Sequence, residues 1–403
     1  MPREQSTNFS AIFFLLAKKN RRIFKGSMLF LLLPLLLICI PLTSFSSDFF
    51  IREVVTNGNV MPDKSAEISF LLSSAANLTI EIYDPDYTII RHLVKDRNVH
   101  RGTNSFFWDG KDDTGTLVPN EAYYFVITAK DTHDNKAVYN SMLDQRAGAN
   151  LLIDFDSIVS KEGEYTLYFT LPEPSRVSIR AGIHNGPLLK TIVDWKVMSA
   201  GSHNIIWDGR DDMHKIQVMD QNESVVYIRA MALPGQVILM SGSNDNYPEY
   251  HRSLSVSHEL SKKQQIAFDT VQQAAITSQN KSSIISDHIL RDATEKAPVI
   301  IVYAASDRSI PLAERQSTLT SGVFNLSVEV DPLSLPNFQE IRYETVIFID
   351  NIKYDEEENA YAPFIYPLDT RALTNGKHNV TVNLTSMSGQ IGSYSFTLDV
   401  INE

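Results

Sequence analysis

The chain contains very little cysteine. Its 403 residues include one, Cys39, so the chain can form no disulfide within itself. Thiolate zinc sites, iron–sulfur clusters and haem attached through paired cysteines each need several cysteines and are excluded. Lipid attachment at Cys39 is not expected, because Ile38 stands where a lipoprotein signal has a small residue. Domains of about 90–100 residues must therefore be stable through their hydrophobic cores alone, which is feasible at that size.

Sequence signatures of enzymes are also missing. The chain has no Gly-x-Ser-x-Gly nucleophile elbow, no phosphate-binding Walker loop and no dinucleotide-binding glycine fingerprint. Its ten histidines show no spacing typical of metal ligands. We therefore assign no catalytic, cofactor-binding or metal-binding residue, expect no cofactor, and predict that the protein is not an enzyme.

An excess of basic residues is absent as well. Asp and Glu number 48 against 36 Lys and Arg, which gives a net charge of −12. A polyanion would be repelled by such a chain. We therefore predict that neither a nucleic acid nor an anionic membrane surface is a partner.

The longest apolar run, residues 28–42, is too short to cross a bilayer, which needs roughly 20 residues. Basic residues precede this run and small residues follow it, as in a secretory signal peptide. Residues 1–47 are therefore predicted to be a signal peptide cut near Ser46/Ser47. The alternative is an uncleaved signal-anchor formed by residues 28–42. Either form predicts that the rest of the chain is extracytoplasmic: secreted, periplasmic or on the cell surface.

The tripeptide Trp-Asp-Gly occurs twice, at residues 108–110 and 207–209, and the copies are 99 residues apart. Four further pairs of segments keep this offset: Phe70 with Phe169, Leu78–Ile80 with Val177–Ile179, Arg91–Leu93 with Lys190–Ile192, and Gly102–Asn104 with Gly201–His203. A constant register over roughly sixty residues predicts a duplicated domain. Each copy is long enough to be a complete small domain with its own core.

Apolar and polar residues alternate along short segments of the first copy, as in half-buried strands. Asp84–Tyr87 has the composition of a β-turn, with proline at its second position. The expected strands are Ala66–Leu72, Leu78–Tyr83, Ile89–Val94, Asn104–Trp108 and Ala122–Ala129. Short strands separated by turns, without a helical period, predict an antiparallel β-sandwich.

These residues resemble the Ig-like domain of the flagellar hook-capping protein, FlgD. The match rests on Ile82–Asp84, Gly102, Trp108–Gly110, Asp112, Gly115 and Tyr123–Ala129. It covers residues 49–146 as one domain and residues 147–240 as a second, in which His214 replaces the glycine of the turn. The resemblance implies an Ig-like fold. It implies little about function, because hook caps use the flagellar export route and this chain begins like a secreted protein.

Residues 298–403 contain further alternating segments, among them Phe324–Val330, Glu344–Asn351 and Ser393–Val400. Asn375-Gly376 is typical of a left-handed turn before a strand. This region resembles the bacterial Ig-like domains of secreted enzymes and adhesins, without a Trp-Asp-Gly turn.

Residues 241–297 are predicted to be a connector. Ser241–Pro248 reads as a linker, and Leu260–Ile276 and Ser283–Leu290 have weak helical patterns. The connector either rests loosely on a neighbouring domain or docks a partner, since connectors of this length are uncommon unless they are used. The predicted fold class is therefore all-β: tandem Ig-like antiparallel β-sandwiches with an N-terminal signal segment and a partly helical or irregular connector.

Three sets of residues could in principle form a site. Acidic clusters in the two Trp-Asp-Gly turns (Asp109, Asp112, Asp113 and Asp208, Asp211, Asp212) lack the closing glutamate of a calcium loop, because Asn120 is the twelfth residue. We expect these carboxylates to cap turn amides. Trp108 and Trp207 are expected to be core anchors rather than platforms for sugar rings. Tyr247, Tyr250, Tyr361 and Tyr366 are the candidates for an exposed aromatic surface.

Three functions fit these observations. The first is an extracytoplasmic scaffold or adhesion-type protein whose Ig-like modules contact a protein partner in the envelope or extracellular space. The second is an accessory protein that binds a carbohydrate or another surface polymer. The third is a non-catalytic subunit of a larger extracytoplasmic complex. Contact with a membrane is expected only through an uncleaved N-terminal segment.

Overall fold

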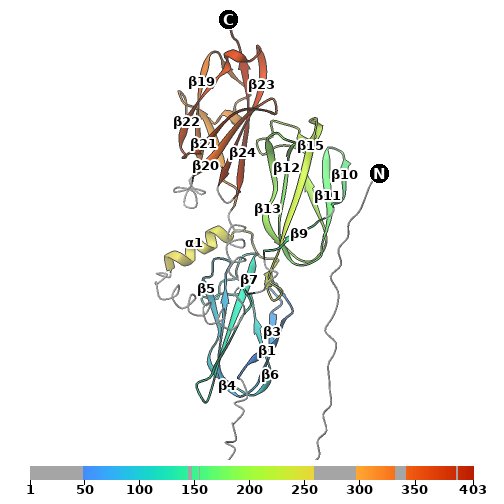
Figure 1. Ribbon diagram of the computed structural model, residues 1–403, viewed down its shortest axis with the longest axis vertical. Helices are drawn as coiled ribbons and strands as arrows, with labels where there is room; N and C mark the ends of the chain where they lie inside the picture. The colour runs from blue at the N-terminus through green and yellow to red at the C-terminus, as the bar shows by residue number, and fades with distance from the viewer. Residues whose placement is uncertain (1–48, 144–147, 154, 258–295, 332–341, 387–388) are drawn as a thin grey trace, which may run out of the picture. The chain divides into compact units, whose positions relative to one another are not determined.

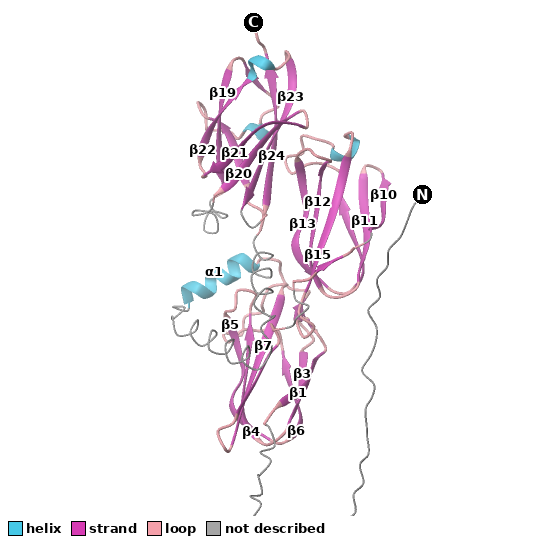
Figure 2. Cartoon of the chain, viewed as in Figure 1, coloured by secondary structure: helices cyan, strands magenta, loops and turns pink. Residues whose placement is uncertain are grey.

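The computed structural model describes residues 49–143, 148–153, 155–257, 296–331, 342–386 and 389–403. Within these ranges the chain is built of β-strands, short 3-10 helices and a single α-helix, α1 (Tyr247–Ser257) (Figure 1, Figure 2). The predicted all-β class is confirmed. The predicted signal segment, residues 1–47, lies outside the described residues. Among the residues that are described, no helix has the length and apolar character to cross a membrane.

The first sandwich packs a three-stranded sheet, in the order β1-β3-β6, against a larger sheet in the order β2-β16-β7-β4-β5. The strands are β1 (Ile51–Thr56), β2 (Asn59–Val60), β3 (Ala66–Leu72), β4 (Ala76–Tyr83), β5 (Ile89–Val99), β6 (Gly102–Trp108), β7 (Ala122–Asp131), β8 (Lys136–Asn140), which pairs with β7, and β16 (Ile238–Met240). Alternate residues of β3 and β4 are buried, as their pattern predicts. They form one core with residues of β7 and with Trp108.

One strand of this first sandwich comes from much later in the chain. In β16, Ile238 pairs antiparallel with Tyr123 of β7, and Met240 pairs parallel with Val60 of β2. Both side chains lie in the core of the first sandwich. The sequence places residues 238–240 at the end of the second domain, 147–240, whereas the structure pairs them with strands of the first. The chain therefore leaves the first sandwich after β8, forms the second sandwich, and returns to the first.

The second sandwich is built like the first. Its sheets have the orders β10-β11-β14 and β13-β12-β15-β9. The strands are β9 (Asn150–Leu151), β10 (Phe155–Lys161), β11 (Glu164–Leu171), β12 (Ser175–Ile183), β13 (Leu188–Met198), β14 (Gly201–Trp207) and β15 (Ser224–Ala232), with a 3-10 turn, η1 (Val218–Asp220), before β15. The pairings β11–β14, β12–β13 and β12–β15 reproduce β3–β6, β4–β5 and β4–β7 of the first sandwich.

The third sandwich has sheets in the orders β17-β19-β22 and β18-β24-β23-β20-β21. Its elements are β17 (Ile300–Ala304), η3 (Leu312–Glu314), β18 (Thr318–Thr320), β19 (Val323–Val330), β20 (Tyr343–Ile349), β21 (Ile352–Ala360), β22 (Phe364–Asp369), η5 (Thr370–Ala372), β23 (Gly376–Ser386) and β24 (Ile391–Val400). Gly376 has a φ of 125°, which suits the predicted turn before β23. Both sheets contribute to one core.

The described part of the connector contains α1, which begins at Tyr247 inside the predicted linker Ser241–Pro248. Leu254 of α1 lies in the core of the first sandwich, and Tyr250 packs against it. The predicted helical segments Leu260–Ile276 and Ser283–Leu290 lie outside the described residues.

Candidate interaction surfaces

Both Trp-Asp-Gly tryptophans are core anchors, as predicted. Trp108 is fully buried and Trp207 is 5% exposed. The indole Nε1 of each donates a hydrogen bond to the carbonyl of the residue three positions later, Lys111 or Arg210, at 2.9 Å in both turns. The ring of Trp108 also meets Tyr123 edge-on, with centroids 5.3 Å apart. Neither ring offers a face on which a sugar could stack.

The acidic residues of these turns hold the turn backbone, which confirms the capping prediction. Asp112 Oδ1 accepts hydrogen bonds from the amides of Thr114 and Thr116, both at 2.9 Å. Asp211 Oδ1 accepts from the amides of Lys215 and Ile216, at 2.7 and 2.8 Å. The remaining acids are engaged by turn amides or by basic side chains: Asp109 with the Lys111 amide, Asp208 with the Arg210 amide, Asp113 with His92, and Asp212 with Lys190. No group of three or more His, Cys, Asp or Glu within the described ranges is placed to hold a metal ion.

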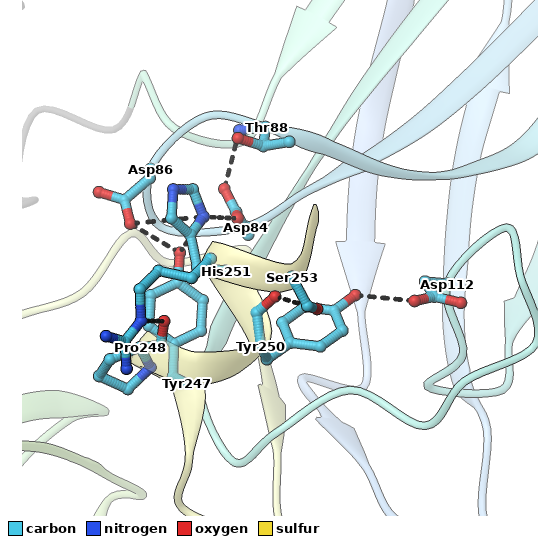
Figure 3. A network of polar contacts seen from close by, with 10 residues as sticks. Asp84, Asp86, Thr88, Asp112, Tyr247, Pro248, Tyr250, His251 and Ser253 are labelled. Atoms are coloured by element: carbon cyan, nitrogen blue, oxygen red, sulfur yellow. Dashed lines mark hydrogen bonds and ion pairs between the residues drawn. The ribbon is translucent and has the colours of Figure 1, made fainter. Parts of the chain in front are cut away.

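A buried ion pair fixes α1 to the first sandwich (Figure 3). Asp84, at the start of the turn between β4 and β5, is fully buried. Its Oδ1 accepts the Thr88 amide at 2.8 Å, and its Oδ2 lies 2.9 Å from Nδ1 of His251 on α1. Burial raises the pKa of Asp84. The hydrogen bond to Asp84 raises the pKa of His251, although partial burial of the ring opposes this effect.

Two tyrosines of α1 bind two further carboxylates of the same sandwich. The Tyr247 hydroxyl donates to Asp86 Oδ2 at 2.8 Å. The Tyr250 hydroxyl donates to Asp112 Oδ2 at 3.1 Å, so this carboxylate serves the Trp-Asp-Gly turn with one oxygen and α1 with the other. Figure 3 shows the helix lying between the β4–β5 turn and the turn that carries Asp112.

The predicted exposed aromatic surface is wrong for three of its four tyrosines. Tyr247 and Tyr250 are only partly exposed, and their hydroxyls are used within the fold. Tyr366 is buried, and its hydroxyl donates to Asp355. Tyr361 alone is exposed, at 55%. The four rings therefore do not form one platform.

Exposed apolar residues lie instead on the three-stranded sheet of the second sandwich. Across β14, β11 and β10, Ile206 is opposite Thr166, and Thr166 is opposite Val159. Ile206 is 64% exposed and Val159 is 48% exposed. Tyr168, two residues after Thr166 on β11, therefore points to the same side and is 39% exposed. We call Val159, Thr166, Tyr168 and Ile206 the outward face of the second sandwich.

The first sandwich carries an apolar residue at the matching position. Phe107 on the edge strand β6 is 62% exposed and stands 99 residues before Ile206 on the edge strand β14. The sequence holds a signal for both residues. Phe107-Trp108 and Ile206-Trp207 are pairs of adjacent apolar residues in a strand, and since neighbours point to opposite faces, one of each pair must face outward.

A second buried ion pair joins residues of the first two sandwiches. Arg176 of β12 is 1% exposed, and its Nη1 donates to Glu121 Oε1 at 2.9 Å. Burial alone would lower the pKa of Arg176, but the adjacent carboxylate raises it above its usual value. The other oxygen of Glu121 accepts the Ala122 amide at the start of β7. The pair is embedded in the fold and has no access for a substrate.

Comparison with known families identifies part of the first sandwich. The family model of the FlgD Ig-like domain matches residues 58–133, which run from just before β2 to just after β7. The match covers less than half of the chain. It contains the first Trp-Asp-Gly turn, but neither β16 nor α1. No curated protein matches the chain.

Three solved structures that are similar to parts of this chain all have low TM-scores. FlgD from P. aeruginosa is 20% identical over 36% of this chain and 92% of its own, with a TM-score of 0.19. A tetra-tandem repeat from the extending region of a large adhesion protein is 16% identical over 87% of this chain and 74% of its own, with a TM-score of 0.19. An endo-β-1,4-mannanase from Thermotoga petrophila is 12% identical over 29% of this chain, with a TM-score of 0.20, and 24% of its length is covered.

Proposed function

We propose that this protein is an extracytoplasmic, non-catalytic scaffold that presents Ig-like sandwiches for contact with another protein. The observation that carries the proposal is the exposed apolar position shared by the first two sandwiches, Phe107 and Ile206. Side chains of this size on a regular sheet are suited to burial against a partner. Because Phe107 and Ile206 occupy the same position in the two repeats, one chain offers a partner two similar apolar contact points.

The uncharged centre of the outward face favours a protein partner, with the charged Lys161 and Glu164 lying at one end of the same side of the sheet. Val159, Thr166, Tyr168 and Ile206 include no ionised group, on a chain with a net charge of −12. The interior of a protein–protein interface is typically depleted of charge and contains aromatic and aliphatic anchors. A polysaccharide partner would call for several exposed aromatic rings in one plane, and Tyr168 is the single aromatic residue of this face.

The test is retention of a partner from envelope extract by the intact protein. The variant Phe107→Ser/Ile206→Ser should lose the partner that the unchanged protein retains, as identified by mass spectrometry. A matched control is Ile352→Ser, since Ile352 is 73% exposed but lies on β21 of the third sandwich. All three side chains are exposed, so thermal stability should change by no more than about 0.5 kcal/mol. Equal retention by the double variant would contradict the proposal, as would retention of a purified surface polysaccharide in place of protein.

The extracytoplasmic location has its own test. The proposal expects the mature protein to begin near Ser47, because residues 1–47 have the composition of a secretory signal. N-terminal sequencing of protein from the envelope or the medium would establish the cut. An intact N-terminus in the membrane fraction would support the anchored form, and an intact N-terminus in the cytosol would refute the location.

A further inference from the structure

The two sandwiches differ at the turn that faces α1. In the first, the Asp84 amide donates to the Thr88 carbonyl at 3.0 Å. In the second, the Ile183 amide donates to the Pro187 carbonyl at the same distance, so Ile183 occupies the position of Asp84. The same turn therefore closes without a carboxylate. Since a buried carboxylate is costly unless it is paired, Asp84 serves a purpose other than the turn itself.

That purpose is to hold α1. The Asp84 carboxylate meets His251 from the helix, and Asp86 of the same turn meets Tyr247. Asp86 also lies 3.7 Å from His251, so two carboxylates face one imidazole. Because all of these contacts join one turn to one helix, the extra polar groups of the first sandwich are explained by the docking of α1.

The second sandwich receives a different element at the corresponding place. Leu188, which directly follows its turn, exchanges two hydrogen bonds with the side chain of Asn383 from β23, both at 2.8 Å. Its carbonyl also accepts the Ser393 hydroxyl of β24 at 2.7 Å. Met213, in the Trp-Asp-Gly turn of this sandwich, packs against the core of the third sandwich. In both repeats, therefore, the β-turn and the Trp-Asp-Gly turn contact an element that follows later in the chain.

We propose that this end of the repeat is its docking end, and that in the first sandwich α1 occupies it as a releasable plug held by the His251–Asp84 ion pair. The helix has 11 residues, and among its described side chains Leu254 lies in the buried core and Tyr250 packs against it. Few apolar contacts resist its departure, so the polar contacts decide whether it stays. This proposal does not depend on the outward faces of the sheets.

The plug should loosen as the pH rises. The pKa of His251 is raised in the docked state, so its contribution is fully present below its ordinary value near about 6.5 and is lost as the pH passes the raised value. Burial raises the pKa of Asp84 and protonated His251 opposes that rise, so deprotonation of His251 leaves the buried carboxylate without compensation and favours the open state. The other groups that act on Asp84 are Tyr123 and Tyr124 of β7 and Tyr247 and Tyr250 of α1. Burial raises the pKa of all four, so they stay protonated over this range.

Hydrogen exchange on the intact protein tests the proposal. Protection factors of the α1 amides, measured from about pH 5 to about pH 9, should fall by about 10–100-fold as the charge-assisted hydrogen bond is lost. Those of β7 should stay constant. Asp84→Asn keeps an oxygen for the Thr88 amide but removes the charge, so it should lower α1 protection at acidic pH and flatten the pH profile.

Two further variants separate docking from folding. Asp113→Asn removes the carboxylate nearest to His92, which also lies 3.7 Å from Glu81. These ion pairs belong to the same sandwich and do not include a residue of α1, so the variant should leave the α1 profile unchanged. Tyr250→Phe should lower α1 protection at every pH and keep its pH dependence. If α1 and β7 lose protection together, the helix is an integral part of the sandwich and the plug is refuted. A flat profile for the unchanged protein would refute the role of His251.

Discussion

Replacement of Trp108 by Ala should destabilise the first sandwich by about 3–5 kcal/mol, the usual cost of removing a large buried aromatic side chain. Because Trp108 is fully buried, the substitution removes nearly all of the apolar surface that this side chain contributes to the core. The variant also loses the edge-on contact with Tyr123, worth about 0.5–1.5 kcal/mol, and the hydrogen bond to Lys111. Small domains are stable by about 5–15 kcal/mol, so this loss is a large share of the total.

The assay must resolve one sandwich from another, because a chain with several domains does not unfold in a single two-state transition. Native-state hydrogen exchange in β3 and in β11 reports the first and second sandwich separately. Trp108→Ala should lower protection in β3 and leave β11 unchanged, and Trp207→Ala should do the reverse. The control is Phe107→Ala, the exposed neighbour of Trp108, with an expected change within about 0.5 kcal/mol.

The result that would refute this reasoning is a small change in stability. If Trp108→Ala costs less than about 1 kcal/mol and instead abolishes binding of a partner or glycan, the indole is a binding platform and not a core anchor. A loss of protection in β11 equal to that in β3 would show that the two sandwiches unfold as one cooperative unit. The estimate for a single domain would then not apply.

Three further predictions concern other buried positions. Arg176→Met should cost about 3–5 kcal/mol because it leaves Glu121 buried without a partner, whereas Arg176→Met combined with Glu121→Leu should recover most of that loss in thermal unfolding. Ile238→Ala should cost about 2–5 kcal/mol and lower exchange protection in the first sandwich, although sequence order places this residue after the second. Gly209→Ala should destabilise the second sandwich in urea titration, because a Cβ there would lie 2.5 Å from the ring of Tyr165 and φ is +76°.

The repeat and its core anchors could be predicted from sequence because their signals are local. Two copies of one register predicted two sandwiches, and alternation correctly placed strands such as β3 and β4. Strands without an apolar face were missed. β10 is exposed along nearly its whole length, and β21 carries a run of acids, so neither shows the pattern of a half-buried strand.

Long-range pairing explains the other errors. Residues 238–240 are apolar, but nothing in their sequence distinguishes a strand of the second sandwich from one that returns to the first. The same holds for Tyr247 and Tyr250. A tyrosine in a polar segment looks exposed until the fold brings a carboxylate to its hydroxyl. The sequence also does not predict α1 as a helix, because the few apolar residues of this segment are spread among polar ones.

The late arrival of β16 imposes an order on the assembly of the chain. During synthesis, the second sandwich has all of its strands once residue 232 has emerged, whereas the first still lacks the strand between β2 and β7 until residue 240 follows. The first sandwich is therefore begun before the second but completed after it. Until that moment the first residues of β7, Ala122 and Tyr123, lack their partner strand, although β8 already pairs with Val126–Lys130 further along β7. Another chain could pair with this short open stretch at that stage but not afterwards. The second sandwich is thus inserted within the sequence of the first, and the first can be completed only after the second has been synthesised.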